Sequence, residues 1–229
     1  MSDPRDHLAL ALDIGALGPA LELATRLEPW FGIAKVGMEL YAEAGPAAVE
    51  ALQGKGFRVF ADLKLYDIPN TLHRAARAHG RRGVEFLNFP AAVGEASLRA
   101  GVEGFLEGAA DAHLPVPTAL GVTVLTSDPD AGALVPRMEI ARAAGCAGVV
   151  CAGGDVALAR ARGLRTMVPG IRPVGADSHD QARVDTPSDA IARGADWLVI
   201  GRAVTAAEEP EIAAVEVTRV VERALTNAS

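Results

Sequence analysis

Short apolar runs alternate with longer segments of helical spacing along the whole chain. The apolar runs are typical of strands, and the segments between them, rich in Ala, Leu, Glu and Arg, are typical of helices. Eight strands are predicted, near residues 8–12, 33–36, 59–61, 86–89, 118–122, 148–151, 166–168 and 197–200. Helices are predicted between them, for example over residues 17–27, 46–53, 71–81, 95–106, 135–144 and 156–162.

The strict alternation of strand and helix predicts the fold class. Parallel strands need a crossover connection, which a helix provides, so the sheet is predicted to be parallel. Eight such units in 229 residues predict an α/β fold, a single (β/α)8 TIM barrel that occupies residues 1–229 as one domain. Glycines placed just before strands are predicted to end helices in the left-handed conformation, namely Gly54, Gly83, Gly145, Gly163 and Gly194.

Composition and charge exclude several classes of protein. Half of the residues are apolar, which allows a substantial core, and the formal net charge is -7. An acidic chain without a basic run is not expected to bind nucleic acid. The charged start and the short apolar run behind it predict neither a signal peptide nor a membrane span, so a cytoplasmic location is expected. Cys146 and Cys151 lack the partners of a zinc site or a disulfide framework and are predicted to be small buried side chains.

A cluster of charges follows the third predicted strand. Side chains two positions apart on a strand point to the same side, so Asp62 and Lys64 are predicted to stand together at its carboxyl end. Asp67 lies three residues further on, where it could reach the same ammonium group or turn elsewhere, and the spacing Asp-x-Lys-x-x-Asp resembles a charge relay. Two other interpretations stay open. The first two residues could form a surface ion pair that contributes little, and Asp67 could cap a helix that begins near Pro69.

Two further charged residues are associated with the first and second predicted strands. Asp13 follows the first strand, and Lys35 lies in the second. Alone, Asp13 would more often be a turn residue, and Lys35 a lysine whose stem lies on apolar surface. In barrels of this type, however, the active site lies at the carboxyl ends of the strands, so both are predicted to converge on one mouth with Asp62 and Lys64. There the charges would perturb one another's protonation, as active sites tend to require.

The ends of the last two strands carry a separate signal, which indicates phosphate binding. Loops at these positions often hold phosphate in such barrels, Gly201 allows close backbone approach, and Arg202 can donate two hydrogen bonds to phosphate oxygens. A tight turn with an exposed arginine is the alternative. The irregular segment 169–187 is long enough to form a lid over a site, and a surface loop is the alternative.

A set of short motifs is distributed over nearly the whole chain. It comprises Ala11-Leu12-Asp13, Lys35-Val36-Gly37, Asp62-Leu63-Lys64, Asp67-Ile68-Pro69-Asn70-Thr71, Val122-Thr123-Val124-Leu125-Thr126-Ser127, Pro169-Gly170-Ile171-Arg172-Pro173, Asp180-Gln181 and Ile200-Gly201-Arg202. Together these motifs are highly specific. Through them the chain resembles the family of orotidine 5'-monophosphate decarboxylases.

The resemblance implies an activity and a chemical role for four charges. It implies a (β/α)8 homodimer that uses no metal and no organic cofactor, and that converts orotidine 5'-monophosphate to UMP and CO2 in the last step of de novo UMP synthesis. Lys64 would donate a proton to C6 of the pyrimidine after CO2 leaves, and Asp62 would lie against the departing carboxylate. Lys35 and Asp67 would complete an alternating Lys-Asp-Lys-Asp array.

The resemblance also implies the contacts that hold the substrate. Asp67, Ile68 and Thr71 would reach across from the partner subunit of the dimer. The other substrate-binding residues would be Asp13 and Lys35 at the ribose hydroxyls, Thr126 at the base, and Arg172, Gln181, Gly201 and Arg202 at the phosphate end.

The chain departs from the family pattern at two places. Pro90 stands where many members have His after the fourth strand, and Ala152-Gly153 stands where Ser-Ala is common. Neither place belongs to the acid-base array. The departures therefore bear on loop packing more than on the reaction.

Two other functions remain as alternatives. Keto-gulonate phosphate decarboxylases and hexulose phosphate synthases share the Asp-x-Lys-x-x-Asp motif but use a metal, and residues 68–71 and the predicted lid favour the orotidylate enzymes. A non-catalytic nucleotide-binding protein is the second alternative. The retained charges speak against it, because a binder would gain little from a carboxylate that faces the substrate's own.

Overall fold

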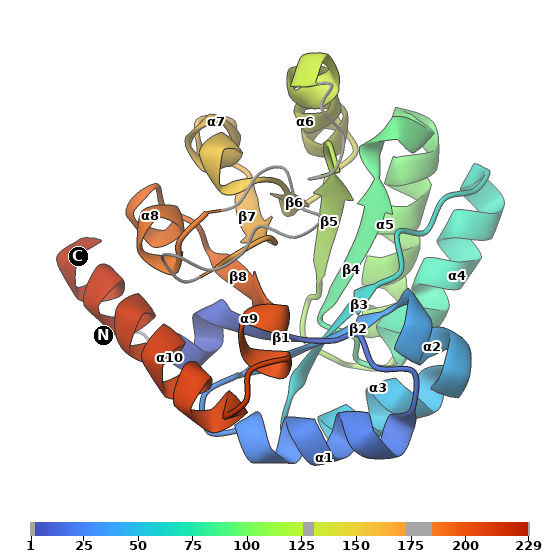
Figure 1. Cartoon of the computed structure of the whole chain (residues 1–229). Helices are drawn as coiled ribbons and strands as arrows, with labels where there is room; N and C mark the ends of the chain where they lie inside the picture. Colours follow the sequence, from blue (N-terminus) through green and yellow to red (C-terminus); the bar gives the residue numbers. More distant parts are fainter. Residues whose placement is uncertain (1–2, 126–130, 173–184, 229) are drawn as a thin grey trace.

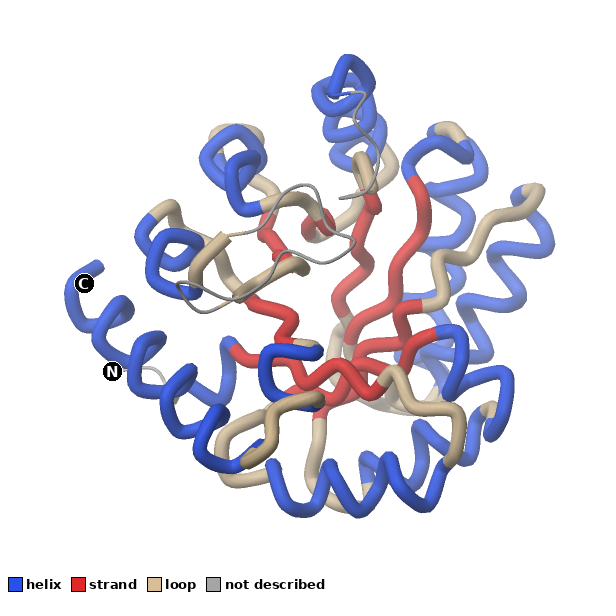
Figure 2. Tube along the Cα trace, viewed as in Figure 1, coloured by secondary structure: helices blue, strands red, loops and turns tan. Residues whose placement is uncertain are grey.

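The eight strands close into a barrel in the order of the sequence. The computed structural model describes residues 3–125, 131–172 and 185–228, and Figures 1 and 2 show the strands surrounded by helices. Every neighbouring pair is parallel, and β8 pairs with β1 to complete the ring, so the predicted (β/α)8 barrel is confirmed. The strands are β1 (Leu8–Leu12), β2 (Ile33–Gly37), β3 (Arg58–Asp62), β4 (Phe86–Pro90), β5 (Thr118–Val122), β6 (Gly148–Val150), β7 (Arg165–Val168) and β8 (Trp197–Ile200).

The helices cover the outside of the barrel. Those expected from the sequence are α1 (Leu17–Leu27), α3 (Pro46–Gln53), α4 (Pro69–Arg81), α5 (Glu95–Asp111), α6 (Leu134–Ala143) and α7 (Val156–Arg160). The described residues form four more helices, for which no bounds were predicted: α2 (Met38–Ala44), α8 (Pro187–Ala192), α9 (Arg202–Thr205) and α10 (Pro210–Ala228). Short 3-10 turns are η1 (Pro4–His7), η2 (Ala91–Val93), η3 (Ala131–Ala133) and η4 (Gly153–Asp155). Within the described residues, no helix combines the length and apolar character that a membrane crossing requires.

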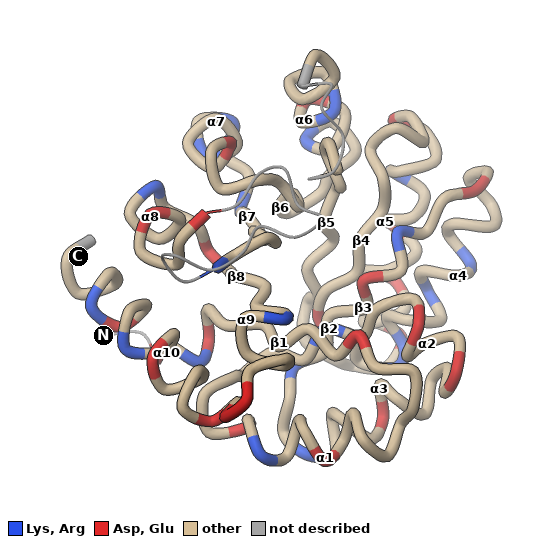
Figure 3. The backbone as a smooth tube through the Cα atoms, in the orientation of Figure 1, with Lys and Arg blue, Asp and Glu red and all other residues tan. Residues whose placement is uncertain are grey.

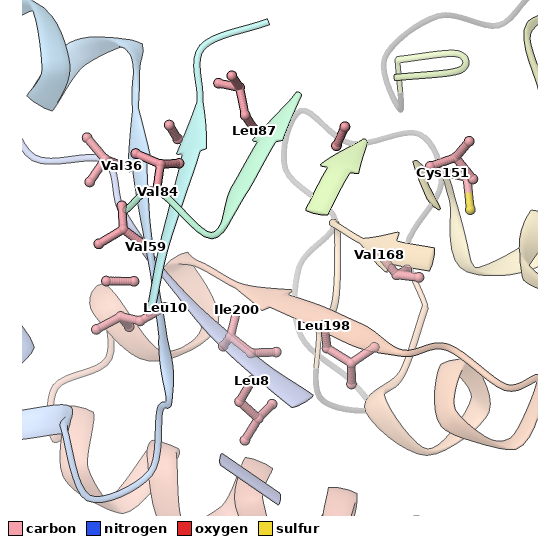
Figure 4. Close-up of a cluster of buried hydrophobic side chains, with 14 of the residues drawn as sticks. Leu8, Leu10, Val36, Val59, Val84, Leu87, Cys151, Val168, Leu198 and Ile200 are labelled. Atoms are coloured by element: carbon pink, nitrogen blue, oxygen red, sulfur yellow. The ribbon is translucent and has the colours of Figure 1, made fainter. Parts of the chain in front are cut away.

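Apolar side chains pack in two layers because both faces of each strand are buried. All five residues of β1 are buried, and Leu8 and Leu10 belong to the outer layer, between the sheet and the helices. Figure 4 shows them in that layer with Ile200. Ala9 and Ala11 belong to the second layer, inside the barrel. Two buried faces explain why the strands appear in the sequence as continuous apolar runs rather than alternating ones.

Aromatic rings close the barrel interior near the amino-terminal ends of the strands. Phe86 packs edge-on against Phe60 and Trp197, with ring centroids 6.3 and 4.8 Å apart. The guanidinium of Arg165 lies over the Trp197 ring, 3.8 Å from its centroid. Since this end is filled by rings, the open end is the carboxyl-terminal mouth.

The left-handed conformation predicted at Gly54 is wrong, although α3 does end at this glycine. Gly54 has φ −61°, so it still has helical geometry after α3, and the left-handed residue is Gly56, with φ +89°. The chain needs one more turn after α3 before Phe57 can turn back, and the Phe57 N–H donates to the Leu52 carbonyl at 3.2 Å. The other predicted stops have positive φ, at Gly83, Gly145, Gly163 and Gly194.

The segment predicted as a lid is described only at its two ends, and residues 173–184 lie outside the described residues. Ile171 and Asp185 form an isolated parallel bridge, and the Arg172 N–H donates to the Asp185 carbonyl at 3.0 Å. The Asp185 carboxylate also pairs with Arg193 and fills the space that a side chain at Gly153 would need. The glycine at this departure from the family pattern therefore makes room for Asp185.

Candidate active site

Polar side chains replace apolar ones where the inward-facing rows of β2, β3 and β4 reach the mouth. Ile33, Phe60 and Phe86 belong to the interior layer. Side chains alternate along a strand, so the residues two positions later face the same interior. Those residues are Lys35, Asp62 and Asn88. Asp13, which comes just after β1, is next to Lys35 at the mouth, because β1 is the neighbour of β2.

The two lysines and two of the aspartates form a continuous chain of ion pairs. Lys35 Nζ lies 2.8 Å from Asp13 Oδ1 and 3.3 Å from Asp62 Oδ2. Lys64 Nζ lies 2.6 Å from the other oxygen of Asp62, Oδ1. The side chain of Lys35 is 8% exposed and that of Asp62 16%, so the centre of the chain is withdrawn from water. A Cβ at Gly37 would overlap with Asp13 Oδ1, so any larger residue there would displace the Asp13 carboxylate from its position.

The pKa of Asp62 lies below its usual range. Burial of the carboxyl group acts to raise the pKa, but the positive charges of Lys35 and Lys64 and hydrogen bonds from Lys64 and Asn88 outweigh it. Asp62 is therefore a fixed negative charge between two ammonium groups. A charge of this kind is able to destabilise a second carboxylate placed against it.

Lys64 approaches Asp62 through a turn and not along the strand. The sequence predicted their contact from alternation within a strand, but β3 ends at Asp62. Lys64 adopts a left-handed backbone with φ +51°, a conformation that costs a non-glycine residue roughly 1–2 kcal/mol. Its backbone N–H donates to Asn88 Oδ1 at 2.8 Å. The contact between Asp62 and Lys64 is present, for a different structural reason.

Two adjoining pockets share Lys35, Asp62, Pro169 and Val199 as lining residues. The first is mainly apolar and adds Phe60, Lys64, Val122, Val124, Leu125, Val150 and Cys151. The second is more polar and adds Ala11, Asp13, Gly170, Ile171, Arg172, Gly201, Arg202 and Thr205. A ligand with a flat apolar end and an anionic end would fit this arrangement, with the ion-pair chain at the junction.

The polar pocket combines two arginines with the backbone at Gly170 and Gly201. Arg172 is buried, 5% exposed, whereas Arg202 is exposed and begins α9. Figure 3 shows acidic and basic segments distributed along the chain, with a basic segment at α9. Guanidinium groups suit the oxygens of a phosphate because they donate paired hydrogen bonds.

Asp67, Ile68 and Thr71 face outward instead of joining the ion-pair chain. All three are exposed, and Ile68 is 65% exposed. Asp67 Oδ1 accepts a hydrogen bond from the Ile68 N–H at 2.7 Å, at the start of α4. Among the described residues, Asp67 takes part in none of the ion pairs of Lys35 or Lys64. Thr126 and Gln181, predicted at the base and the phosphate, lie outside the described residues.

Asn88 is a site residue that was not predicted from the sequence. Its amide contacts both Asp62 and the backbone of Lys64, and it is fully buried. The signal was available, because Asn88 is polar within the apolar strand β4 and lies two positions after the inward-facing Phe86. An internal amide in an otherwise apolar strand has to be hydrogen-bonded inside the protein.

The described residues offer no group of three or more His, Cys, Asp or Glu side chains suited to hold a metal ion. Both cysteines are buried, as predicted. Burial raises the pKa of the Cys146 thiol to about 12, and burial together with Asp155 and Asp196 raises that of Cys151. Cys151 lines the apolar pocket as a neutral thiol.

Comparison with known proteins places this architecture in one family. Residues 6–217 match the model of the family described as "Orotidine 5'-phosphate decarboxylase / HUMPS family". A protein of Moorella thermoacetica named orotidine 5'-phosphate decarboxylase is 43% identical, over 92% of this chain and 90% of its own length. One of Alkalilimnicola ehrlichii with the same name is 45% identical, over 89% and 91%.

Solved structures show the same similarity. The crystal structure of orotidine 5'-phosphate decarboxylase from Lactobacillus acidophilus superposes with a TM-score of 0.82 at 28% identity, over 94% of this chain and 99% of that one. An uncharacterized conserved protein from Geobacillus kaustophilus gives 0.78 at 29% identity, over 93% and 99%.

Proposed function

The chain belongs to the orotidine 5'-phosphate decarboxylase / HUMPS family and is a carboxy-lyase of that family, and we propose that it converts orotidine 5'-monophosphate to UMP and CO2 with Lys64 as the proton donor. This is the last step of de novo UMP synthesis. One observation carries the mechanism. Lys64 and Lys35 flank Asp62 at the junction of an apolar and a polar pocket.

The pockets suit the two ends of a nucleotide. The pyrimidine would occupy the apolar pocket, beside Phe60 and Val122. The phosphate would lie in the polar pocket, with Arg172, Gly201 and Arg202. The ribose would then pass Asp13 and Lys35, which are joined at 2.8 Å and able to bind its hydroxyl groups. We also assign Thr126 to the base and Gln181 to the phosphate, on the family resemblance alone.

The chemistry requires charges that are fixed before the substrate arrives. When the bond between C6 and the carboxylate breaks, its electron pair stays on a ring carbon that has no evident sink. Lys64 stabilises this developing negative charge and then transfers a proton from Nζ to C6. Asp62 lies beside the carboxylate of the bound substrate, and this repulsion ends when neutral CO2 leaves. Contacts at the remote phosphate supply binding energy that offsets the repulsion.

We propose that the active enzyme is a homodimer in which Asp67, Ile68 and Thr71 reach the partner's site. The outward position of all three supports this, because in their own subunit they are exposed and line neither of the two substrate pockets. Ile68 belongs with two other exposed large apolar side chains, Met38 and Tyr66, on the segments that follow β2 and β3. A second copy would cover these apolar side chains, and its own Asp67 would then complete the array of Lys35, Asp62 and Lys64.

The test is direct. Purified protein is mixed with orotidine 5'-monophosphate, and the loss of its ultraviolet absorbance is followed with and without a chelator. Equal turnover in both samples supports a decarboxylase that needs no metal. Loss of turnover with chelator would favour the metal-dependent sugar-phosphate branch, and no turnover in either sample would leave the nucleotide-binding alternative.

A further inference from the structure

Asn88 connects the two residues at the centre of the site although it lines neither pocket. Its Oδ1 accepts the backbone N–H of Lys64 at 2.8 Å, and its Nδ2 donates to Asp62 Oδ1 at 2.7 Å. Its backbone carbonyl accepts the Leu65 N–H at 3.2 Å. The side chain is fully buried, so water cannot substitute for these partners without entering the core.

The first contact explains how Lys64 keeps its conformation. The backbone pairing of β3 with β4 is recorded at Phe60 with Phe86 and at Ala61 with Leu87, and it stops before Asp62. Beyond this point the Asn88 amide takes the place of a backbone acceptor for Lys64. A left-handed lysine persists only where its surroundings enforce it. The N–H bond to Asn88 and the ion pair to Asp62 are the two described contacts that do so.

The second contact fixes the orientation of the Asp62 carboxylate. Its Oδ1 accepts from Lys64 Nζ and Asn88 Nδ2, while its Oδ2 faces Lys35 Nζ at 3.3 Å. With three donors around two oxygens, rotation of the carboxylate breaks at least one bond. The hydrogen bond from the Asn88 amide also contributes to lowering the pKa of the Asp62 carboxyl group.

We infer that Asn88 is a positioning residue for the decarboxylation, which holds Lys64 and Asp62 in the geometry of the reaction without touching the substrate. The inference rests on the proposed function. A single amide does this with both of its polar atoms. Its acceptor sets the backbone of the proton donor, and its donor sets the carboxylate that opposes the substrate.

Two variants separate positioning from stability. Asn88→Leu keeps the branched shape of the side chain, with a larger volume, and removes both contacts. It is expected to lower kcat by roughly ten- to a hundredfold, as small misplacements of reacting groups do. Binding of UMP, which lacks the carboxylate, should change by less than about threefold, because Asn88 does not line the pockets. Phe89→Leu, on the same strand but in the outer apolar layer, is the control for weakened packing and should keep kcat.

The pH dependence of kcat in Asn88→Asp distinguishes a positioning role from an effect on packing alone. The new carboxyl group can still accept the Lys64 N–H, but it donates to Asp62 only when it is protonated. Its kcat is expected to rise relative to wild type as the pH falls, whereas Asn88→Leu shows no such recovery. Wild-type kcat in both variants, or equal losses of kcat and UMP affinity that match Phe89→Leu, would overturn the inference.

A crystal structure of Asn88→Leu keeps the inference testable if the proposed function fails. Absence of turnover by the wild-type protein would refute the function and leave the positioning role open to this measurement. Lys64 is expected to leave φ near +51° and to lose its 2.6 Å contact with Asp62. A variant in which Lys64 keeps its left-handed backbone and its contact with Asp62 would contradict the inference, whatever the activity.

Discussion

Lys64 Nζ lies 2.6 Å from Asp62 Oδ1, and the two residues are joined by a backbone that has already left the strand. Because Lys64 is left-handed, its side chain turns back toward a residue only two positions earlier. The lysine thereby lines the apolar pocket together with the carboxylate that orients it.

Replacing Lys64 with alanine should abolish turnover while the protein stays folded. The proton donor and the positive charge beside C6 are both lost, so kcat should fall by more than the roughly 10²- to 10⁴-fold expected for a positioned acid alone. Steady-state assays and circular dichroism measure the two effects. Lys55→Ala removes an exposed lysine far from the site and serves as control. Near-wild-type activity in Lys64→Ala would refute the role of this residue.

Arg202→Ala should weaken the reaction of the nucleotide much more than that of the bare nucleoside. The guanidinium lies in the polar pocket, remote from Lys64, and it is expected to matter only when a phosphate dianion is bound. Comparison of kcat/KM for orotidine 5'-monophosphate and orotidine measures this difference, with the exposed Arg219→Ala on α10 as control. Equal losses on both substrates would instead assign Arg202 to the fold or the base site.

A mixture of two inactive variants should recover activity if Asp67 serves the partner's site. In a dimer of Lys64→Ala with Asp67→Asn, one site carries both defects and the other carries neither. Random pairing after refolding of an equal mixture makes about half of the dimers mixed, so about a quarter of all sites should be native. The assay is run with subunit exchange verified by mass. Activity no higher than the parents' average would mean that Asp67 acts in its own chain or only caps α4.

His79 should make the protein less stable as the pH falls. It is 7% exposed beside Tyr41, and its Nδ1 has no hydrogen-bond partner among the described residues. Burial, with a smaller contribution from Arg82, lowers its pKa to about 4. In the unfolded chain the imidazole gains its proton near pH 6.5, so the unfolded state binds more protons between these values. The stability present above about pH 6.5 is therefore lost progressively down to about pH 4, by about 3 kcal/mol.

The measurement is urea unfolding of wild type and His79→Leu at several pH values. The variant should lose less free energy of unfolding than wild type between pH 7 and pH 4. His113→Asn is the control, because His113 is exposed and asparagine tolerates its left-handed backbone. Parallel curves for wild type and His79→Leu would show that His79 is protonated equally in the folded and unfolded states.

The barrel fold and the charged residues at its mouth could be predicted from the sequence. Strict alternation of strand and helix forces a parallel sheet, and parallel strands bring their carboxyl ends to one edge, where Asp13, Lys35 and Asp62 meet. Local patterns were less informative about the backbone conformation where elements end. Helix α3 ends before Gly54, as predicted, yet Gly56 is the residue that adopts the left-handed conformation.

Sequence by itself determined which strands exist and which charges follow them, and therefore which charges share the mouth. The strands and helices are recognised from local patterns, namely short apolar runs and the helical period of 3.6 residues. Only the tertiary structure decided how Lys64 is held, because its anchor, Asn88, lies 24 residues further along the chain on the neighbouring strand. It also decided that Asp67 faces outward while Lys64 turns in. Both outcomes depend on where β3 leaves the sheet, and hydrogen bonds between segments distant in sequence fix that point.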